Sequence, residues 1–214
     1  MMILIIMEKN IILRLQMLLE TIKIENRLIC NLEWHNARLN NSRNALLGIQ
    51  DSLDLSTIIK LPDDLGDDTY RCRVLYGQEI DEIQFIPHQS RMVKSLRMIH
   101  CNDIDYGYKF ADRTKLEELF EMRGDCDEIL IIKDGYITDT SISNIIFRQP
   151  DGRWLTPVTP LLKGTMRTYL LETGQIAEAV IRPEDLPLFT EARMINCMLD
   201  LESSPAIQID NIIS

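Results

Sequence analysis

The stretch GYITDTSISNIIF, residues 135–147, constrains the fold of this chain more than any other. Both of its ends carry apolar residues typical of a strand, but its middle holds Asp139, Asn144 and three hydroxyl side chains. Strands disfavour Asp and Asn, and burying a carboxylate without a partner is costly. A fold that accepts Asp139 at this place must therefore give its carboxylate a group to face.

The composition is that of an ordinary globular protein with a sizeable core. Apolar residues make up 45% of the 214 residues and charged residues 26%, and the formal net charge is −10. This acidic balance argues against nucleic acid and against an anionic membrane as the main partner. An anionic small molecule stays compatible with it, because a local site can be positive on an acidic protein.

Cysteine and histidine usage predicts neither a disulfide framework nor a metal site. The five cysteines are scattered, odd in number and without a C-x-x-C pair, which favours a reducing cytoplasm. His35, His88 and His100 lack metal-ligand spacing, and we expect packing or surface roles for them. The opening MMILIIM is too short to span a bilayer and lacks the features of a signal peptide, so we expect an edge strand or a poorly ordered start.

The first half of the chain predicts a small α/β layer. β-prone segments on both sides of Glu25 and Asn26 indicate a hairpin within residues 18–32. A helix is expected to follow, with Asn31 as its N-cap and Gly48 as its stop. The buried side of this helix is expected to run through His35, Leu39, Ser42 and Leu46. A polar connection over residues 61–69 then leads into the strands YRCRVLYG and EIDEIQFIP.

The second half alternates strand and helix signals. Strands are expected in RMVKSLRMIH, EILIIKD, NIIFRQ and ARMINCML. Helices are expected in DRTKLEELFEMRG, capped by Asp112 and stopped by Gly124, and in KGTMRTYLLETG, which ends at Gly174. The pattern changes around Pro87–Ser90, so we expect an α/β protein of two domains, with a smaller domain over residues 1–88 and a larger one over residues 89–214.

Lys109 is the first candidate for chemistry. It lies in IDYGYKFADR among aromatic residues, just before a predicted helix. A lysine in such a place is ordinarily a solvated loop residue. A desolvated lysine, however, has a lowered pKa and becomes an imine-forming nucleophile.

Three further features are candidates for a binding site: two could bind an anion, and the third is an isolated acid. LLKGTMR opens a helix with Gly164, and the N–H groups of a helix N-terminus suit a phosphate, although an ordinary capped helix start would read the same. Arg38 could bind the same anion or be a surface arginine of its helix. Asp139 could cap a local turn through its own backbone.

Together these features are the set that pyridoxal phosphate requires. Lysine supplies the covalent link, while the arginine and the helix N-terminus bind the phosphate. A carboxylate beside the pyridine nitrogen favours the protonated ring, which is the better electron sink. This interpretation gives the carboxylate of Asp139 a group to face, the ring nitrogen, and the small hydroxyl side chains would leave room for the ring.

From about Leu18 to Ile209 the chain resembles the fold-type IV pyridoxal phosphate enzymes. These include the branched-chain and D-amino acid aminotransferases and 4-amino-4-deoxychorismate lyase. HNARL at residues 35–39 is similar to the family's phosphate-binding H-x-x-R-L, and TDTSISNIIF is similar to its T-E-x-x-x-x-N-[IL]-F. The resemblance implies that Lys109 is catalytic and that six residues bind the cofactor: Arg38, Lys109, Asp139, Asn144 and, through their backbone amides, Thr165 and Met166.

Two details resemble the lyase more than the aminotransferases. KFADR has an arginine four residues after the lysine, and Asn196 in ARMINCML matches an asparagine of a lyase strand. We therefore predict an enzyme, a lyase that eliminates pyruvate from aminodeoxychorismate to give 4-aminobenzoate for folate synthesis. The alternatives are an aminotransferase of the branched-chain or D-amino acid type, a catalytically silent binding protein on the same fold, and an unrelated α/β domain.

The chain also departs from the family pattern. Asp139 stands where most members have a glutamate, and the N-terminal half is shortened. Arg27 replaces a common hairpin glycine, so Asn26 is expected to adopt the positive φ. The resemblance further implies a homodimer that acts on a small-molecule amine, and it leaves Arg71, Arg73 and Arg113 as candidates for binding a substrate carboxylate.

Overall fold

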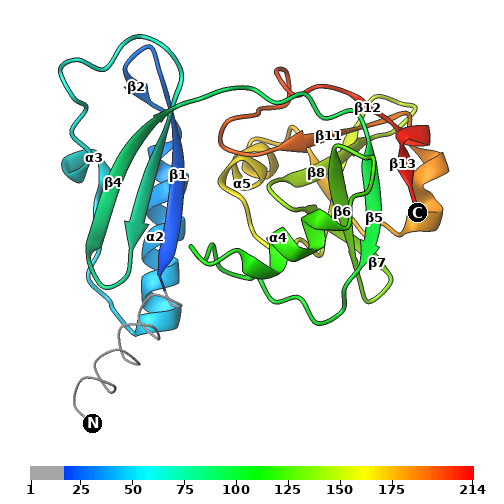
Figure 1. The fold of residues 1–214 in the computed structure, drawn as a ribbon, viewed down its shortest axis with the longest axis horizontal. Coiled ribbons are helices and arrows are strands. Elements are labelled where there is room, and N and C mark those ends of the chain that lie inside the picture. Colours follow the sequence, from blue (N-terminus) through cyan, green and yellow to red (C-terminus); the bar gives the residue numbers. More distant parts are fainter. Residues whose placement is uncertain (1–16) are drawn as a thin grey trace. The chain divides into compact units, whose positions relative to one another are not determined.

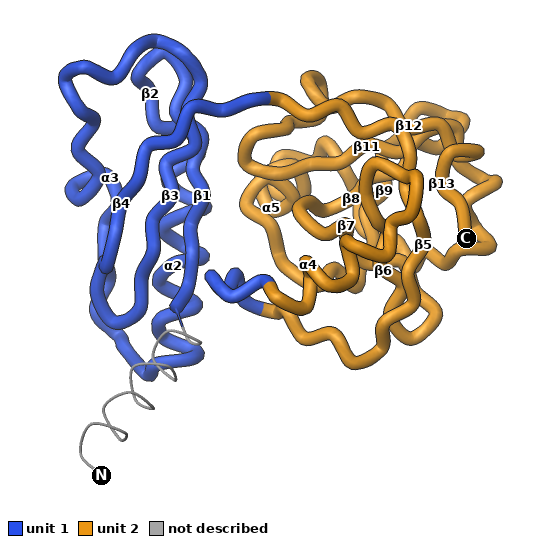
Figure 2. Tube along the Cα trace, viewed as in Figure 1, with its two compact units in different colours: residues 1–89, 108–113 blue, residues 90–107, 114–214 orange. Residues whose placement is uncertain are grey.

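The computed structural model describes residues 17–214, which form two compact units. Figure 2 shows them in different colours: of the described residues, one unit comprises residues 17–89 together with Tyr108–Arg113, and the other comprises Ser90–Gly107 and Thr114–Ser214. The chain passes from the first unit to the second after Gln89. The segment 108–113 returns to the first unit, so the two units are not two continuous ranges of the sequence. The strand or poorly ordered start expected at MMILIIM lies outside the described residues.

The first unit begins with the predicted hairpin. Strands β1 (Leu18–Glu25) and β2 (Leu28–Ile29) pair through a turn in which Asn26 has φ 50° and Arg27 has φ 61°. Positive φ at both central residues is the geometry of a two-residue type I′ turn, which matches the twist of the strands. The expectation for Asn26 is confirmed. Arg27 shares the strained conformation, and its guanidinium donates to the carbonyl of Pro62 at 3.2 Å and to that of Leu65.

A four-stranded antiparallel sheet of order β2-β1-β3-β4 forms the rest of this unit, with β3 at Tyr70–Tyr76 and β4 at Ile80–Pro87 (Figure 1). Helix α2 (Leu32–Leu47) begins after Asn31 and ends at Gly48, as predicted. Its buried face differs at one position, because Leu46 is 40% exposed and Arg43 is buried instead. Arg43 donates to the carbonyls of Gln78 and Asp51, so the helix buries a hydrogen-bonded cation there. A short helix, α3 (Leu55–Ile58), follows α2.

The segment 108–113 attaches to the start of β1. Phe110 forms a bridge with Leu18, and the backbone N–H of Leu19 donates to the carbonyl of Lys109 at 2.9 Å. Phe110 also packs against the core of this unit, which Leu18, Ile22 and Leu39 help to form. The backbone of Lys109 is therefore fixed by strand-like pairing to β1, although Lys109 lies far along the chain from it.

The second unit contains a nine-stranded sheet in which β10-β9-β8-β7-β6-β5-β13 form one path and β11 joins β8 to β12. Pairs β5·β6, β9·β10 and β5·β13 are parallel, whereas β6 to β9 are successively antiparallel. The strands are β5 (Leu96–His100), β6 (Glu128–Lys133), β7 (Tyr136–Thr140), β8 (Asn144–Arg148), β9 (Trp154–Pro157), β10 (Ala177–Ala179), β11 (Glu191–Ile195), β12 (Ile207–Gln208) and β13 (Ile212–Ile213).

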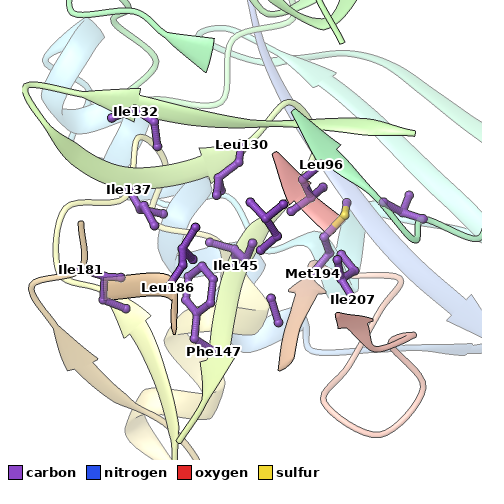
Figure 3. Close-up of a cluster of buried hydrophobic side chains, with 13 residues drawn as sticks. Leu96, Leu130, Ile132, Ile137, Ile145, Phe147, Ile181, Leu186, Met194 and Ile207 are labelled. Carbon is purple, nitrogen blue, oxygen red and sulfur yellow. The ribbon is translucent and has the colours of Figure 1, made fainter. Parts of the chain in front are cut away.

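The core of the second unit lies on these strands. Figure 3 shows apolar side chains from β5, β6, β7, β8 and β11 gathered in one cluster, with Leu130, Ile145 and Phe147 among them. Helices α4 (Thr114–Glu121) and α5 (Thr165–Glu172) appear where the sequence predicts helices, and two short 3₁₀ turns lie at Pro183–Leu188 and Ile209–Asn211. Within residues 17–214, none of the helices has the length and apolar character needed to cross a membrane.

Candidate functional site

Asp139 is buried in the second unit, where two donors face its carboxylate. It lies on β7 opposite Asn144, the first residue of β8. Asn144 Nδ2 donates to Asp139 Oδ1 at 2.7 Å, and the backbone N–H of Leu162 donates to Oδ2 at 2.9 Å. Asn144 Nδ2 also donates to the carbonyl of Leu162 at 2.8 Å. The two side chains thus bind both polar groups of Leu162 and fix the loop that leads into α5.

The hydroxyl groups of the same stretch shape the turn between β7 and β8. Thr140 Oγ1 accepts from the backbone N–H of Ser143 at 3.0 Å and donates to the carbonyl of Ser143 at 3.1 Å. Asn196, which follows β11, donates through Nδ2 to Ser143 Oγ at 2.7 Å. The hydroxyls therefore satisfy a buried turn, and Asn196 is held against it.

The carboxyl group of Asp139 titrates at an unusual pH. Burial raises its pKa from 3.8 to about 6, and this is partly offset by the Leu162 N–H, the Asn144 amide and the charge of Arg167. Burial disfavours the charged form, while donors to the carboxylate favour it. At neutral pH the group is mostly a carboxylate, so it could stabilise a cation such as a protonated ring nitrogen.

Gly164 joins this acid to the helix N-terminus. Its φ of −69° is accessible to any residue, so backbone freedom does not explain the glycine. A Cβ atom added there would lie 2.1 Å from Asn144 Oδ1, which only glycine avoids. Thr165 and Met166 follow as the first residues of α5, and the N–H groups of a first helical turn have no intrahelical acceptor. Both side chains are buried, and the helix dipole adds partial positive charge at this end.

Gly164→Ala is expected to lower the free energy of unfolding of the second unit by about 2 kcal/mol, as overpacking does. The reason is the contact with Asn144, which the new methyl group displaces from Asp139. Each unit contains one tryptophan, Trp34 or Trp154, so urea unfolding followed by Trp154 fluorescence in a Trp34→Phe background reports on the second unit. Gly107→Ala is the control, since its Cβ would meet nothing closer than 3.9 Å. Equal stability of the two variants would contradict the prediction.

The first unit contains Arg38 and Lys109. Arg38 Nε donates to Glu20 Oε1 at 2.7 Å, and Arg38 Nη2 donates to Glu20 Oε2. His35 Nδ1 lies 2.6 Å from the same Oε2. Lys109 is close enough to His35 for its charge to help lower the pKa of that histidine. The fork-shaped guanidinium thus meets a carboxylate in two places, which is the strong geometry for such a pair.

Glu20 is ionised although it is fully buried. Burial alone would raise its pKa, but the charge of Arg38 and the hydrogen bonds from His35 and Arg38 outweigh burial and lower the pKa to about 2. Burial, with the nearby charges of Arg38 and Lys109, lowers the pKa of His35 although Glu20 opposes this effect. His35 is therefore neutral at pH 7 and carries its proton on Nδ1, toward Glu20.

The first unit is expected to lose stability in acid because of Glu20. A folded-state pKa of about 2 against an ordinary value of 4.5 contributes about 3 kcal/mol, fully present above pH 4.5 and lost as pH falls toward 2. Urea unfolding at several pH values, followed by Trp34 fluorescence in a Trp154→Phe background, measures the loss. The change in the free energy of unfolding with pH should be smaller in Glu20→Gln than in wild type. It should be unchanged in Glu33→Gln, whose carboxylate is exposed. Equal slopes in both variants would contradict the assignment.

The structure thus brings together Asp139, Asn144, Thr165 and Met166 in one unit, and Arg38 and Lys109 in the other. Sequence reasoning missed Glu20 and expected only a packing or surface role for His35. The signal for Glu20 was a charged residue at an alternate position of the strand LLETIKI, between the apolar Leu18 and Ile22. The direct contact between Asn144 and Asp139 was also not predicted from the sequence.

A family model and a curated relative both match this chain. The model of the family "Amino-transferase class IV" matches residues 107–202. An uncharacterized protein of Haemophilus influenzae is 42% identical over 183 residues, which cover 85% of this chain and 97% of that protein.

Solved structures share the fold over most of the chain. A "putative 4-amino-4-deoxychorismate lyase" from Haemophilus somnus 129PT has a TM-score of 0.79 and 36% identity, covering 86% of this chain and 97% of its own. A hypothetical aminotransferase from Mycobacterium tuberculosis in its PLP-bound form has a TM-score of 0.72 at 14% identity, covering 93% and 81%. At that identity the second likeness concerns the fold alone.

Proposed function

Since this chain belongs to the class IV aminotransferase family, the fold-type IV enzymes, we propose that it is a 4-amino-4-deoxychorismate lyase. Its cofactor is pyridoxal 5′-phosphate. The reaction would convert 4-amino-4-deoxychorismate into 4-aminobenzoate and pyruvate, in folate synthesis. The observation that carries the proposal is the buried carboxylate of Asp139, held by Asn144 and Leu162 beside the N-terminus of α5.

The residues present fit this cofactor. Asp139 is a carboxylate at neutral pH and so matches a protonated pyridine nitrogen. The start of α5 offers backbone N–H groups without intrahelical acceptors, which suit a phosphate. Arg38 has a guanidinium that Glu20 holds in a fixed orientation and that suits a phosphate. When bound, the cofactor supplies a conjugated ring that withdraws electrons from the substrate carbon bearing nitrogen.

In the proposed reaction Lys109 has the central role. As a neutral amine it removes the proton from the substrate carbon that bears nitrogen. The bond from the adjacent ring carbon to the enolpyruvyl oxygen then breaks, and the ring becomes aromatic. The proton taken by Lys109 balances the one that enolpyruvate gains to become pyruvate. Asp139 would supply the carboxylate beside the ring nitrogen.

The remaining residues bind and orient. We assign phosphate binding to Arg38 and to the backbone amides of Thr165 and Met166. Arg71, Arg73 and Arg113 stay candidates for a substrate carboxylate. Asn196 favours the lyase over an aminotransferase because its place in ARMINCML matches an asparagine of the lyase strand. In the structure its amide donates to Ser143 in the turn that follows Asp139. On the family pattern we also propose a cytoplasmic homodimer.

The test is to add aminodeoxychorismate to the purified protein with pyridoxal phosphate and to assay 4-aminobenzoate and pyruvate together. Equal amounts of both products are expected. A half-reaction that depends on a keto acid and yields pyridoxamine phosphate would instead identify an aminotransferase. Cofactor binding without either reaction would identify a silent binding protein.

A further inference from the structure

Glu20 is a carboxylate in a place where the fold alone calls for an apolar residue. It lies on β1 between Leu18 and Ile22, which face the helix and belong to the core, and it is itself fully buried. Taking a carboxylate out of water is costly unless it is paired and hydrogen-bonded. Hydrogen-bond donors from α2 pair with the Glu20 carboxylate. We therefore look for the reason for this buried acid in its effect on those donors.

The donors come from one face of one helix turn. His35 and Arg38 are three residues apart on α2, a spacing that places both side chains on the same face. Between them they make three contacts with the Glu20 carboxylate, of which Arg38 makes two. A bidentate contact fixes the plane of a guanidinium as well as its position. His35 in turn fixes the second oxygen of Glu20, so the arginine has an acceptor that cannot rotate away.

Attachment of α2 to the sheet does not require this arrangement. Arg43, five residues after Arg38 on α2, anchors the helix by donating to backbone carbonyls of Gln78 and Asp51, and only 1% of its side chain is exposed. Leu39 supplies apolar packing at the same interface. Arg43 also lies 3.4 Å from the exposed carboxylate of Asp51, whereas the carboxylate partner of Arg38 is fully buried and 14% of the Arg38 side chain is exposed. A buried ion pair rarely improves on apolar packing for stability, so the pair at Glu20 indicates a positioning role.

We propose that Glu20 and His35 are positioning residues that fix the Arg38 guanidinium so that it selects a phosphate-bearing cofactor. The inference rests on the phosphate role of Arg38 in the proposed function. A guanidinium fixed before binding loses little conformational entropy when an anion arrives. The opposing effect is Coulombic, since a carboxylate beside Arg38 weakens the field that the anion meets.

These two effects make opposite predictions for Glu20→Gln. If the field dominated, removal of the negative charge would raise the affinity for a phosphate. If the orientation dominates, as we propose, the affinity falls although a repelling charge is gone. The expected fall is about tenfold or more, the lower end of what loss of an orienting partner costs at a metal site.

The measured quantity is the ratio of Kd for pyridoxal to Kd for pyridoxal 5′-phosphate, obtained by absorbance titration of the full chain. A general loss of folding lowers both affinities by the same factor and leaves the ratio unchanged. A lost phosphate contact lowers the ratio alone. Glu20→Asp is expected to have a ratio between those of wild type and Glu20→Gln. Glu33→Gln, on the exposed face of α2, is expected to have the wild-type ratio.

Two substitutions of His35 form a matched pair that does not alter the charge. The amide nitrogen of asparagine takes the place of Nδ1, and that of glutamine takes the place of Nε2. His35→Asn should therefore keep the donor to Glu20 and the wild-type ratio, whereas His35→Gln should lose both. These variants keep the test usable if Glu20→Gln does not fold, because neither leaves a buried ion without its partner.

The double variant Glu20→Gln/Arg38→Gln completes the cycle. Its ratio should equal that of Arg38→Gln alone, because Glu20 acts only through Arg38. An unchanged or higher ratio in Glu20→Gln, or identical ratios in the two His35 variants, would overturn the inference while leaving the proposed function intact. A wild-type ratio near one would overturn both the inference and the phosphate role of Arg38. Lyase products are not needed for any of these outcomes.

Discussion

Lys109→Ala protein is expected to form 4-aminobenzoate and pyruvate at least about 10⁴-fold more slowly than wild type. The substitution removes both the group that links the cofactor to the chain and the base that takes the substrate proton. General base catalysis alone contributes about 10² to 10⁴ in rate, and loss of the nucleophile adds to that. A coupled assay of pyruvate, with cofactor in excess, measures the difference.

The structure predicts that this loss is chemical, not structural. Lys109 is held to β1 by its backbone carbonyl, which accepts from the Leu19 N–H, and alanine keeps that bond. Unfolding of the first unit, followed by Trp34 fluorescence, should therefore change little. Addition of a small alkylamine should restore part of the rate in the variant, because it supplies a base without the tether.

Lys115→Ala is the matched control. Lys115 lies on α4 a short distance along the chain, and 48% of its side chain is exposed beside the exposed Asp103. Such surface pairs contribute little, so this variant should turn over as wild type does. Wild-type turnover by Lys109→Ala would contradict the proposed mechanism. An equal loss of turnover in Lys109→Ala and Lys115→Ala would indicate a structural cause.

The elements of the fold were predictable where a local residue determines them. Asn31 and Gly48 bound α2 in the sequence and in the structure. Gly48 adopts the left-handed conformation that commonly ends a helix. The hairpin was predictable too, and Asn26 indicated where its positive φ would fall. Arg27 was harder, because its partners are carbonyls of Pro62 and Leu65, far along the chain.

The site was predictable as a set of residue types but not as contacts. Asp139 stood out as an acid in a strand, whereas its link to Leu162 depends on how a loop twenty residues later folds back. The reason for Gly164 is a close approach of the Asn144 side chain, which no local pattern reports. The place of Lys109 in the first unit follows from pairing with β1, a contact between segments some ninety residues apart. Such long-range contacts follow from tertiary packing, which local propensity does not determine.

Asp139→Asn is expected to lower turnover by about 10- to 1,000-fold, the range given by a 1–3 unit change in pKa when an opposite charge is removed. The ring nitrogen would lose the carboxylate that favours its protonated form. Cofactor binding should weaken less, since Arg38 and the start of α5 are unchanged. Asp151→Asn, at an exposed turn, is the control and should be silent.

Asp139 also makes a prediction about pH that needs no substrate. Its pKa of about 6 in the folded protein exceeds its ordinary value of 3.8, so the folded state binds the proton more tightly than the unfolded state. The resulting stability is fully present below pH 4 and is lost as pH rises through 6, a difference of about 3 kcal/mol in the cofactor-free protein. Trp154 fluorescence in a Trp34→Phe background isolates this change from that of Glu20, which runs in the opposite direction at lower pH.

The Asp139→Asn variant separates charge from geometry in that experiment. Asparagine has the same shape but offers one acceptor where two donors, Asn144 Nδ2 and the Leu162 N–H, approach. One donor therefore stays unsatisfied, at a cost of about 1–3 kcal/mol that does not depend on pH. The variant should be less stable than wild type at pH 4 and should lack the fall between pH 4 and 6. If the fall persists in the variant, another group is its source, and the ionised state of Asp139 would no longer explain how a strand accepts an acid at this position.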